Sequence, residues 1–84
     1  MPMKYFVYII YSDKLSKFYV GFTEDVSNRI EQHNQGISTF TSRGIPWELK
    51  HAFETESLDE ARKLEKAIKG RGITRYLADK RIKI

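Results

Sequence analysis

Cysteine is absent from the sequence, which excludes disulfide bonds and thiolate metal sites. Stability must therefore come from packing, and 84 residues suffice for one modest hydrophobic core. We expect one domain over residues 1–84. Long apolar runs are also absent: none approaches the roughly 18 residues of a membrane span, and the N-terminus leads into a predicted strand without a cleavable signal. The sequence therefore predicts a cytoplasmic protein with no membrane partner.

Acidic residues are scarce toward the C-terminus. The formal net charge is +4, while residues 1–42 carry four basic and four acidic side chains and are neutral. From Lys66 onward, seven basic side chains stand against Asp79 alone. This concentration of positive charge indicates a nucleic-acid-binding face or, with equal weight, a solvated basic tail.

Two runs rich in β-branched and aromatic residues, at 5–11 and 18–22, predict a β-hairpin. The polar residues between them are typical of a turn. A four-residue loop would pair Ser12 with Lys17. The first run is apolar on both faces, which predicts a central strand that is covered on two sides.

Tyrosines are more frequent in this hairpin than packing requires. In the predicted register, Tyr8 lies opposite Gly21, and Tyr19 lies on the same face. A glycine in a strand leaves space for another group to approach closely. Each tyrosine alone is compatible with a plain core residue, but the pair beside the glycine favours a functional role. Tyr5 and Tyr11 fall on the other face and are expected to pack.

A first helix is predicted over residues 25–35, with Thr23 as its cap and Gly36 as its stop. Arg29 and His33 are i, i+4 neighbours at the edge of its apolar stripe, so both are predicted to point toward the sheet. The alternatives are an exposed helix arginine and a half-buried, hydrogen-bonded histidine.

A loop rich in hydroxyl groups, residues 38–44, precedes a third predicted strand. The loop contains Thr41 and Arg43, and it either meets a phosphate or serves as a simple connector. In the strand, large residues alternate with smaller or charged ones. The alternation places four side chains on the inner face: Trp47, Leu49, His51 and Phe53.

A second helix is predicted to begin at a capping box formed by Ser57 and Glu60. It runs to Lys69 and stops at the glycines that follow, Gly70 and Gly72. Beyond them, a short final helix is expected to begin at a Thr74 cap and to make apolar contacts through Tyr76, Leu77 and Ile82.

Glu65 lies within the apolar arc of the second helix on a helical wheel. A carboxylate that faces a core is costly unless it is paired, hydrogen-bonded or metal-bound. We therefore favour a functional role over the alternative, a glutamate at the margin of the arc that reaches water or a neighbouring cation. A basic strip flanks it: Arg62, Lys66 and Lys69.

The ordered set of these residues resembles the GIY-YIG nuclease domain and, more closely, its small stand-alone bacterial members. The resemblance covers about residues 4–69 and depends on these positions: Val7-Tyr8, Tyr19-Val20-Gly21, Arg29, His33 and Glu65. It implies an α+β fold with a small antiparallel three-stranded sheet flanked by helices, in the order β-β-α-β-α with a short C-terminal helix.

The resemblance also implies a role for each residue. Tyr8 would be the general base or the group that orients the attacking water, and Tyr19 its partner at the nucleophile. Arg29 would stabilise the charge on the phosphate, and His33 would support the same site. Glu65 would bind one divalent metal ion, Mg²⁺ or Mn²⁺.

The function implied is a metal-dependent endonuclease that cleaves DNA or RNA, with DNA favoured, alone or recruited by a protein partner. Contacts to nucleic acid are expected from six residues: Thr41, Arg43, Arg62, Lys66, Lys69 and Arg71. One alternative is a non-catalytic nucleic-acid-binding module on the same scaffold. Another is a protein-interaction adaptor.

Overall fold

The computed structural model describes residues 4–83 and has the element order β-β-α-β-α-α. This order confirms the predicted α+β class, whereas the predicted domain range of 1–84 extends beyond the described residues at both ends. The elements are β1 (Tyr5–Ser12), β2 (Lys17–Thr23), α1 (Val26–Asn34), β3 (Trp47–Thr55), α2 (Leu58–Arg71) and α3 (Ile73–Asp79). A short 3-10 helix, Ser42–Gly44, lies in the predicted loop.

The three strands form one antiparallel sheet in the order β2-β1-β3. The central position of β1 follows from its apolar residues on both faces, and residues 7–10 are all buried. The predicted hairpin register is confirmed, because Ser12 pairs with Lys17 and Tyr8 with Gly21. Tyr8 and Tyr19 therefore lie on the same face of the sheet.

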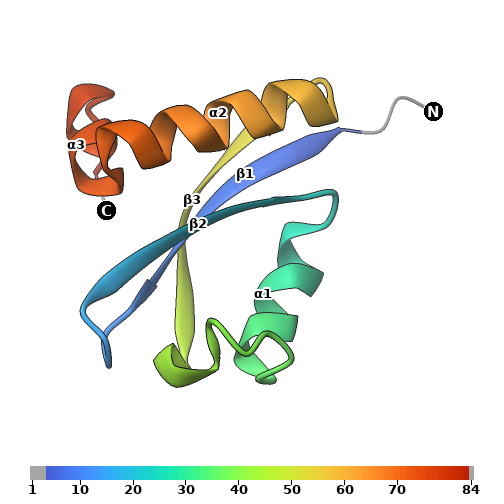
Figure 1. Cartoon of the computed structure of the whole chain (residues 1–84), viewed down its shortest axis with the longest axis vertical. Helices are drawn as coiled ribbons and strands as arrows, with labels where there is room; N and C mark the ends of the chain where they lie inside the picture. Colours follow the sequence, from blue (N-terminus) through green and yellow to red (C-terminus); the bar gives the residue numbers. More distant parts are fainter. Residues whose placement is uncertain (1–3, 84) are drawn as a thin grey trace.

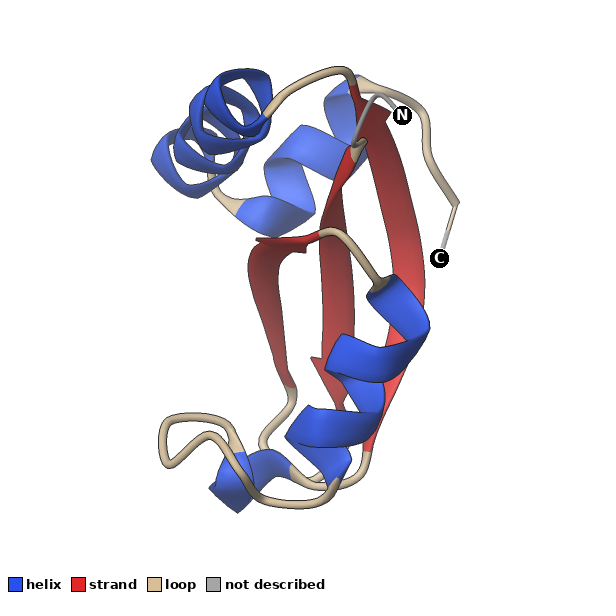
Figure 2. Cartoon of the chain, turned by 90° about the vertical axis from the view of Figure 1, so that its right-hand side faces the viewer, coloured by secondary structure: helices blue, strands red, loops and turns tan. Residues whose placement is uncertain are grey.

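The sheet separates two layers of helices, with α1 on one face and α2 and α3 on the other (Figures 1 and 2). Each face has its own apolar cluster. The cluster under α2 and α3 contains Val7, Ile9, Val20, Ala61, Ile68 and Leu77. The cluster under α1 contains Tyr8, Ile10 and Trp47, with Tyr19, Val26, Ile30 and Ile45 packed against it.

The predicted alternation along β3 is wrong in one respect. The strand register against β1 shifts between Ile9 and Ile10, so that Lys50 is an extra residue in β3. Such a bulge moves the side chains on its two sides to opposite faces of the sheet. Trp47 therefore packs in the cluster under α1, whereas Phe53 packs on the other face.

The helices begin and end close to the predicted positions, with three corrections. Asp25, and not Thr23, caps α1, because its side chain accepts a hydrogen bond from the Asn28 N–H. Gly70 does not stop α2, which continues to Arg71, and Gly72 with φ of 96° ends it. Thr74 does not cap α3, which begins at Ile73.

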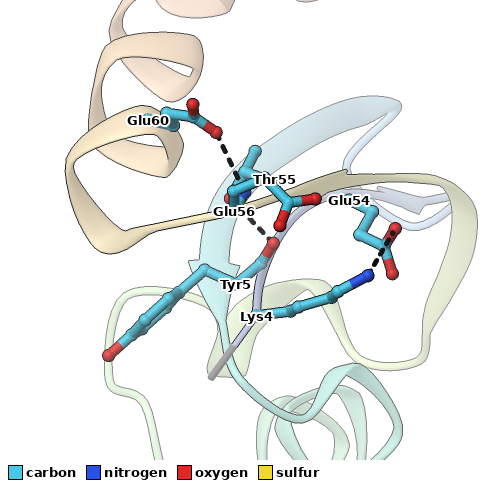
Figure 3. A network of polar contacts seen from close by, with 6 residues as sticks. All are labelled: Lys4, Tyr5, Glu54, Thr55, Glu56 and Glu60. Carbon is cyan, nitrogen blue, oxygen red and sulfur yellow. Dashed lines mark hydrogen bonds and ion pairs between the residues drawn. The ribbon is translucent and has the colours of Figure 1, made fainter. Parts of the chain in front are cut away.

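Polar contacts join the start of β1 to the end of β3 and the first turn of α2 (Figure 3). The Thr55 hydroxyl donates to the Tyr5 carbonyl at 2.8 Å, and Lys4 pairs with Glu54 at 3.4 Å. These contacts hold the start of the central strand β1 in place. None of the helices described is long and apolar enough to cross a membrane.

Candidate functional site

Tyr8 is a buried phenol on the face of β1 that α1 covers. Its side chain is 1% exposed, and its hydroxyl is hydrogen-bonded to His33 Nε2 at 2.8 Å. The space that Gly21 leaves is filled by the Tyr8 ring, since a Cβ atom at Gly21 would lie 2.5 Å from the Tyr8 hydroxyl oxygen. The glycine therefore leaves room over β2 for the phenol, whose hydroxyl reaches His33 of α1.

His33 links this phenol to the loop that follows α1. The imidazole is 1% exposed, and its Nδ1 is hydrogen-bonded to the Thr41 hydroxyl at 2.7 Å. Burial lowers the pKa of His33, and the nearby Arg29 guanidinium lowers it further. The ring is therefore neutral at physiological pH and forms the middle of a buried chain from Tyr8 to Thr41.

Thr41 does not lie where the sequence led us to expect it. It was predicted to contact nucleic acid, but it is fully buried with its hydroxyl bound to His33. Its carbonyl accepts a hydrogen bond from Trp47 Nε1 at 2.7 Å. Thr41 therefore positions His33 and does not meet a phosphate. The signal that points to such a residue is that a buried histidine requires partners for both ring nitrogens.

Arg29 is the positive group that acts on both Tyr8 and His33 in this buried chain. It is half-buried, and its guanidinium donates to Gln32 Oε1 at 3.2 Å. Sequence reasoning did not identify Gln32, which orients the arginine. Arg29 also lines an open hollow of about 360 Å³ between the end of β2 and α1, together with Phe22, Thr23, Glu24, Asp25, Asn28 and Gln32.

The pKa of Tyr8 shows which charges surround its hydroxyl. Burial raises this pKa most, the Arg29 guanidinium opposes the rise, and Tyr19 and Glu65 add to it. Arg29 and Tyr19, from α1 and β2, act on the phenol more strongly than Glu65, which comes from α2 on the other face of the sheet and has the smallest of these effects. The net rise keeps Tyr8 protonated at neutral pH.

Tyr19 connects the buried chain to the protein surface. Its ring is half-buried and packs edge-on against His33, with ring centroids 5.6 Å apart. The Tyr19 ring also packs against the rings of Phe40 and Trp47, with centroid distances of 5.7 and 6.2 Å. Phe40 was not singled out in the sequence, where it was one residue of a polar loop.

Glu65 is the carboxylate on α2 that the sequence singled out. Its side chain is 19% exposed and pairs with Lys69 at 3.4 Å, one turn farther along α2. Within residues 4–83, no three His, Asp or Glu side chains group closely enough to hold a metal ion. A single carboxylate nevertheless fits a magnesium-type ion, which takes most of its ligands from water and substrate phosphate.

The remaining predicted contact residues are basic and exposed, but they differ in their partners. Lys69 is paired with Glu65, and Arg71 donates to both carboxylate oxygens of Asp79 at 2.7 and 3.2 Å. This contact lowers the pKa of Asp79. Arg43, Arg62 and Lys66 are exposed, and none of the three makes an ion pair within the described part of the chain.

Comparison with known proteins gives one family and several similar solved structures. The model of the GIY-YIG catalytic domain matches residues 4–76. The solution NMR structure of a UPF0213 protein from Bacillus halodurans is 32% identical, with a TM-score of 0.50, over 81% of this chain and 72% of that chain. A search of curated proteins found no match.

Proposed function

Since this chain belongs to the GIY-YIG family of nuclease domains, we propose that it is a metal-dependent endonuclease that hydrolyses phosphodiester bonds in nucleic acid, with DNA favoured over RNA. The observation that carries the proposal is the group of residues around the Tyr8 hydroxyl. The phenol is hydrogen-bonded to His33, and the charges of Arg29 and, more weakly, Glu65 act on it. A packing tyrosine in a small core has no need of such neighbours.

Arg29 binds the scissile phosphate and stabilises the negative charge that develops on it. Its charge lowers the pKa of both Tyr8 and His33, so it lies within electrostatic reach of the reacting groups. The hydrogen bond to Gln32 fixes its orientation before the substrate arrives. Preorganised positive charge of this kind avoids reorganisation during the reaction.

Tyr8 accepts a proton from the attacking water through its neutral phenol and not as a resting phenolate. Its raised pKa requires that the phenolic proton leaves as the water proton arrives. His33 Nε2 at 2.8 Å takes the phenolic proton when Nδ1–H donates to Thr41. The water oxygen then bonds to phosphorus while the ester bond breaks, and the leaving oxygen takes up a proton from solvent to become a hydroxyl group. Tyr19 packs on His33 and completes the wall beside the nucleophile.

Glu65 would hold one divalent ion, Mg²⁺ or Mn²⁺, once its carboxylate exchanges Lys69 for the metal. When bound, the metal supplies positive charge to the phosphate and to the leaving oxygen. On α2, no residue three or four positions from Glu65 carries a carboxylate, which supports a one-metal reaction.

The test is cleavage of labelled single-stranded, duplex and branched DNA and RNA in magnesium or in EDTA. We expect metal-dependent cleavage that Glu65→Gln abolishes and that Tyr8→Phe lowers by about 10²- to 10⁴-fold, the usual contribution of a proton-transfer group. Glu31→Gln, which changes an exposed carboxylate on α1, is the control and should cleave as the wild type does. Equal trace cleavage by the wild type and Glu65→Gln would contradict the proposal.

The Glu65–Lys69 ion pair favours one other candidate, a nucleic-acid-binding module without catalysis, because a carboxylate that keeps its lysine does not bind a metal. In that case, the protein would bind nucleic acid with steep salt dependence and cleave none of the substrates.

A further inference from the structure

Phe40 is an exposed aromatic side chain in the loop between α1 and β3. It is 79% exposed, more than any other large hydrophobic side chain in residues 4–83. Exposing a phenyl ring to water forgoes the free energy that its burial would provide. The loop could have placed a polar residue there at no cost to the core, so the exposure requires an explanation.

The loop holds Phe40 in place from both sides. The next residue, Thr41, is fully buried and bonded to His33 and Trp47. The Ser42 hydroxyl donates to the Thr39 carbonyl at 3.0 Å. The phenyl ring is therefore presented to solvent by an anchored segment.

Phe40 lies at the rim of the proposed active site. Its ring centroid is 5.7 Å from that of Tyr19, which itself packs on His33. The loop from Gly36 to Trp47 contains Arg43 and no acidic residue, so its charge suits a polyanion. An exposed aromatic ring and a positively charged side chain are the groups that single-stranded nucleic-acid sites combine.

We propose that Phe40 is a stacking platform for an unpaired nucleobase next to the scissile phosphate. The inference rests on the proposed nuclease function and adds the form of substrate that the site takes. A base within a duplex has both faces covered by its neighbours, so only an unpaired or extruded base offers a free face. The Phe40–Tyr19 pair thus selects substrates with an unpaired nucleotide at the cleavage site.

The test combines substitution of Phe40 with removal of single bases from the substrate. Cleavage sites are first mapped on a single-stranded oligonucleotide, and kcat/KM is then measured on versions with one abasic nucleotide at each position near the site. For wild type, we expect one position where base loss lowers kcat/KM by about 5- to 150-fold, which corresponds to ~1–3 kcal/mol per stacked base. Phe40→Ala should show the same loss on the intact oligonucleotide and no further loss on that abasic version.

Two variants make the result specific to stacking. Phe40→Trp keeps an aromatic face and should retain wild-type kcat/KM, whereas Ile37→Ala removes a 65% exposed apolar side chain of the same loop and should change nothing. Equal cleavage by Phe40→Ala and wild type, or equal losses in Phe40→Ala and Ile37→Ala, would overturn the inference and leave the nuclease function standing. A change from dimer to monomer in Phe40→Ala with unchanged kcat/KM would also overturn it. Failure of the wild type to cleave any substrate would instead contradict the proposed function.

Discussion

At the scale of single residues, the site is a chain of buried polar groups that satisfy one another. Tyr8, His33 and Thr41 are each almost completely buried, and both imidazole nitrogens have hydroxyl partners. In residues 4–83, no buried side-chain nitrogen or oxygen lacks a partner. A satisfied buried network fixes one arrangement of its members, whereas loss of one member leaves the others unpaired. This interdependence explains why a threonine in a loop belongs to the site.

The lowered pKa of His33 predicts a dependence of stability on pH. The folded protein holds His33 neutral, while the unfolded chain takes up its proton near the ordinary value of 6.5. The unfolded state therefore binds more protons. The contribution of His33 to the free energy of unfolding is complete above pH 6.5 and is lost as the pH drops toward the pKa of the folded protein. Urea unfolding between pH 7.5 and pH 5 should show this loss in wild type.

His33→Gln tests the origin of this dependence. It should lower the free energy of unfolding at pH 7.5 by about 1–3 kcal/mol, since buried hydroxyl groups lose a partner, and it should weaken the dependence on pH. His51→Gln is the matched control, because His51 lies against Phe53 on the sheet face away from Tyr8. If the loss of stability on acidification disappeared in His51→Gln and persisted in His33→Gln, His33 would not be the source of the pH dependence.

At the scale of elements, one glycine of β2 leaves room for the tyrosine that links the hairpin of β1 and β2 to the helix α1. Tyr8 crosses β2 at Gly21, and there is no room for a larger residue between the phenol and the strand. Gly70 has the opposite surroundings, since a Cβ atom there would meet nothing within 4 Å and the residue lies inside α2. The same substitution should therefore have opposite effects at these two positions.

Gly21→Ala should lower the free energy of unfolding by about 1–3 kcal/mol, the usual cost of forcing an extra group into a packed site. Gly70→Ala should raise it by up to about 1 kcal/mol, because alanine loses less backbone freedom in a helix. Urea unfolding measures both. Gly21→Ala should also reduce cleavage, since it displaces the Tyr8 hydroxyl from His33. If Gly21→Ala proves as stable and as active as wild type, the close contact between β2 and the phenol is not needed.

Elements with a strong local pattern could be predicted from the sequence. The turn length and the alternation of β1 and β2 gave the hairpin register, and capping at Ser57 gave the start of α2. The bulge at Lys50 was missed because residues on both sides of it keep the local alternation of a regular strand. Its presence depends on pairing with β1, which is far away in the sequence.

The site could be predicted only in part for the same reason. The residues Tyr8, Tyr19, Arg29, His33 and Glu65 were found through their order along the chain, and their roles stay proposals. Thr41 and Phe40 were out of reach, because one is buried and the other exposed through long-range packing of the loop against β2 and β3. The sequence of a polar loop does not show which of its residues will be buried and which will be exposed.

At the scale of the whole molecule, some basic side chains are neutralised by carboxylate partners and others are not. The basic residues Lys63, Lys69 and Arg71 of α2 have carboxylate partners, whereas Arg62 and Lys66 make no ion pair with the described residues. Those two free cations are i, i+4 neighbours and flank Glu65 in sequence. They are therefore suited to hold the backbone of a nucleic acid beside the proposed metal ligand.

This arrangement predicts how binding depends on salt. Each phosphate neutralised by a basic side chain releases counterions and contributes about 0.9 to the slope of log affinity against log salt for duplex DNA. The double variant Arg62→Ala, Lys66→Ala should therefore lower the slope by about 1.8 for two lost contacts, measured by fluorescence anisotropy in EDTA to prevent cleavage. Lys63→Ala is the matched control, because Asp59 at 3.2 Å already balances that charge on the same helix. If Lys63→Ala lowered the slope as much as the double variant does, the protein would attract nucleic acid through its overall charge, and the surface beside Glu65 would not be the contact face.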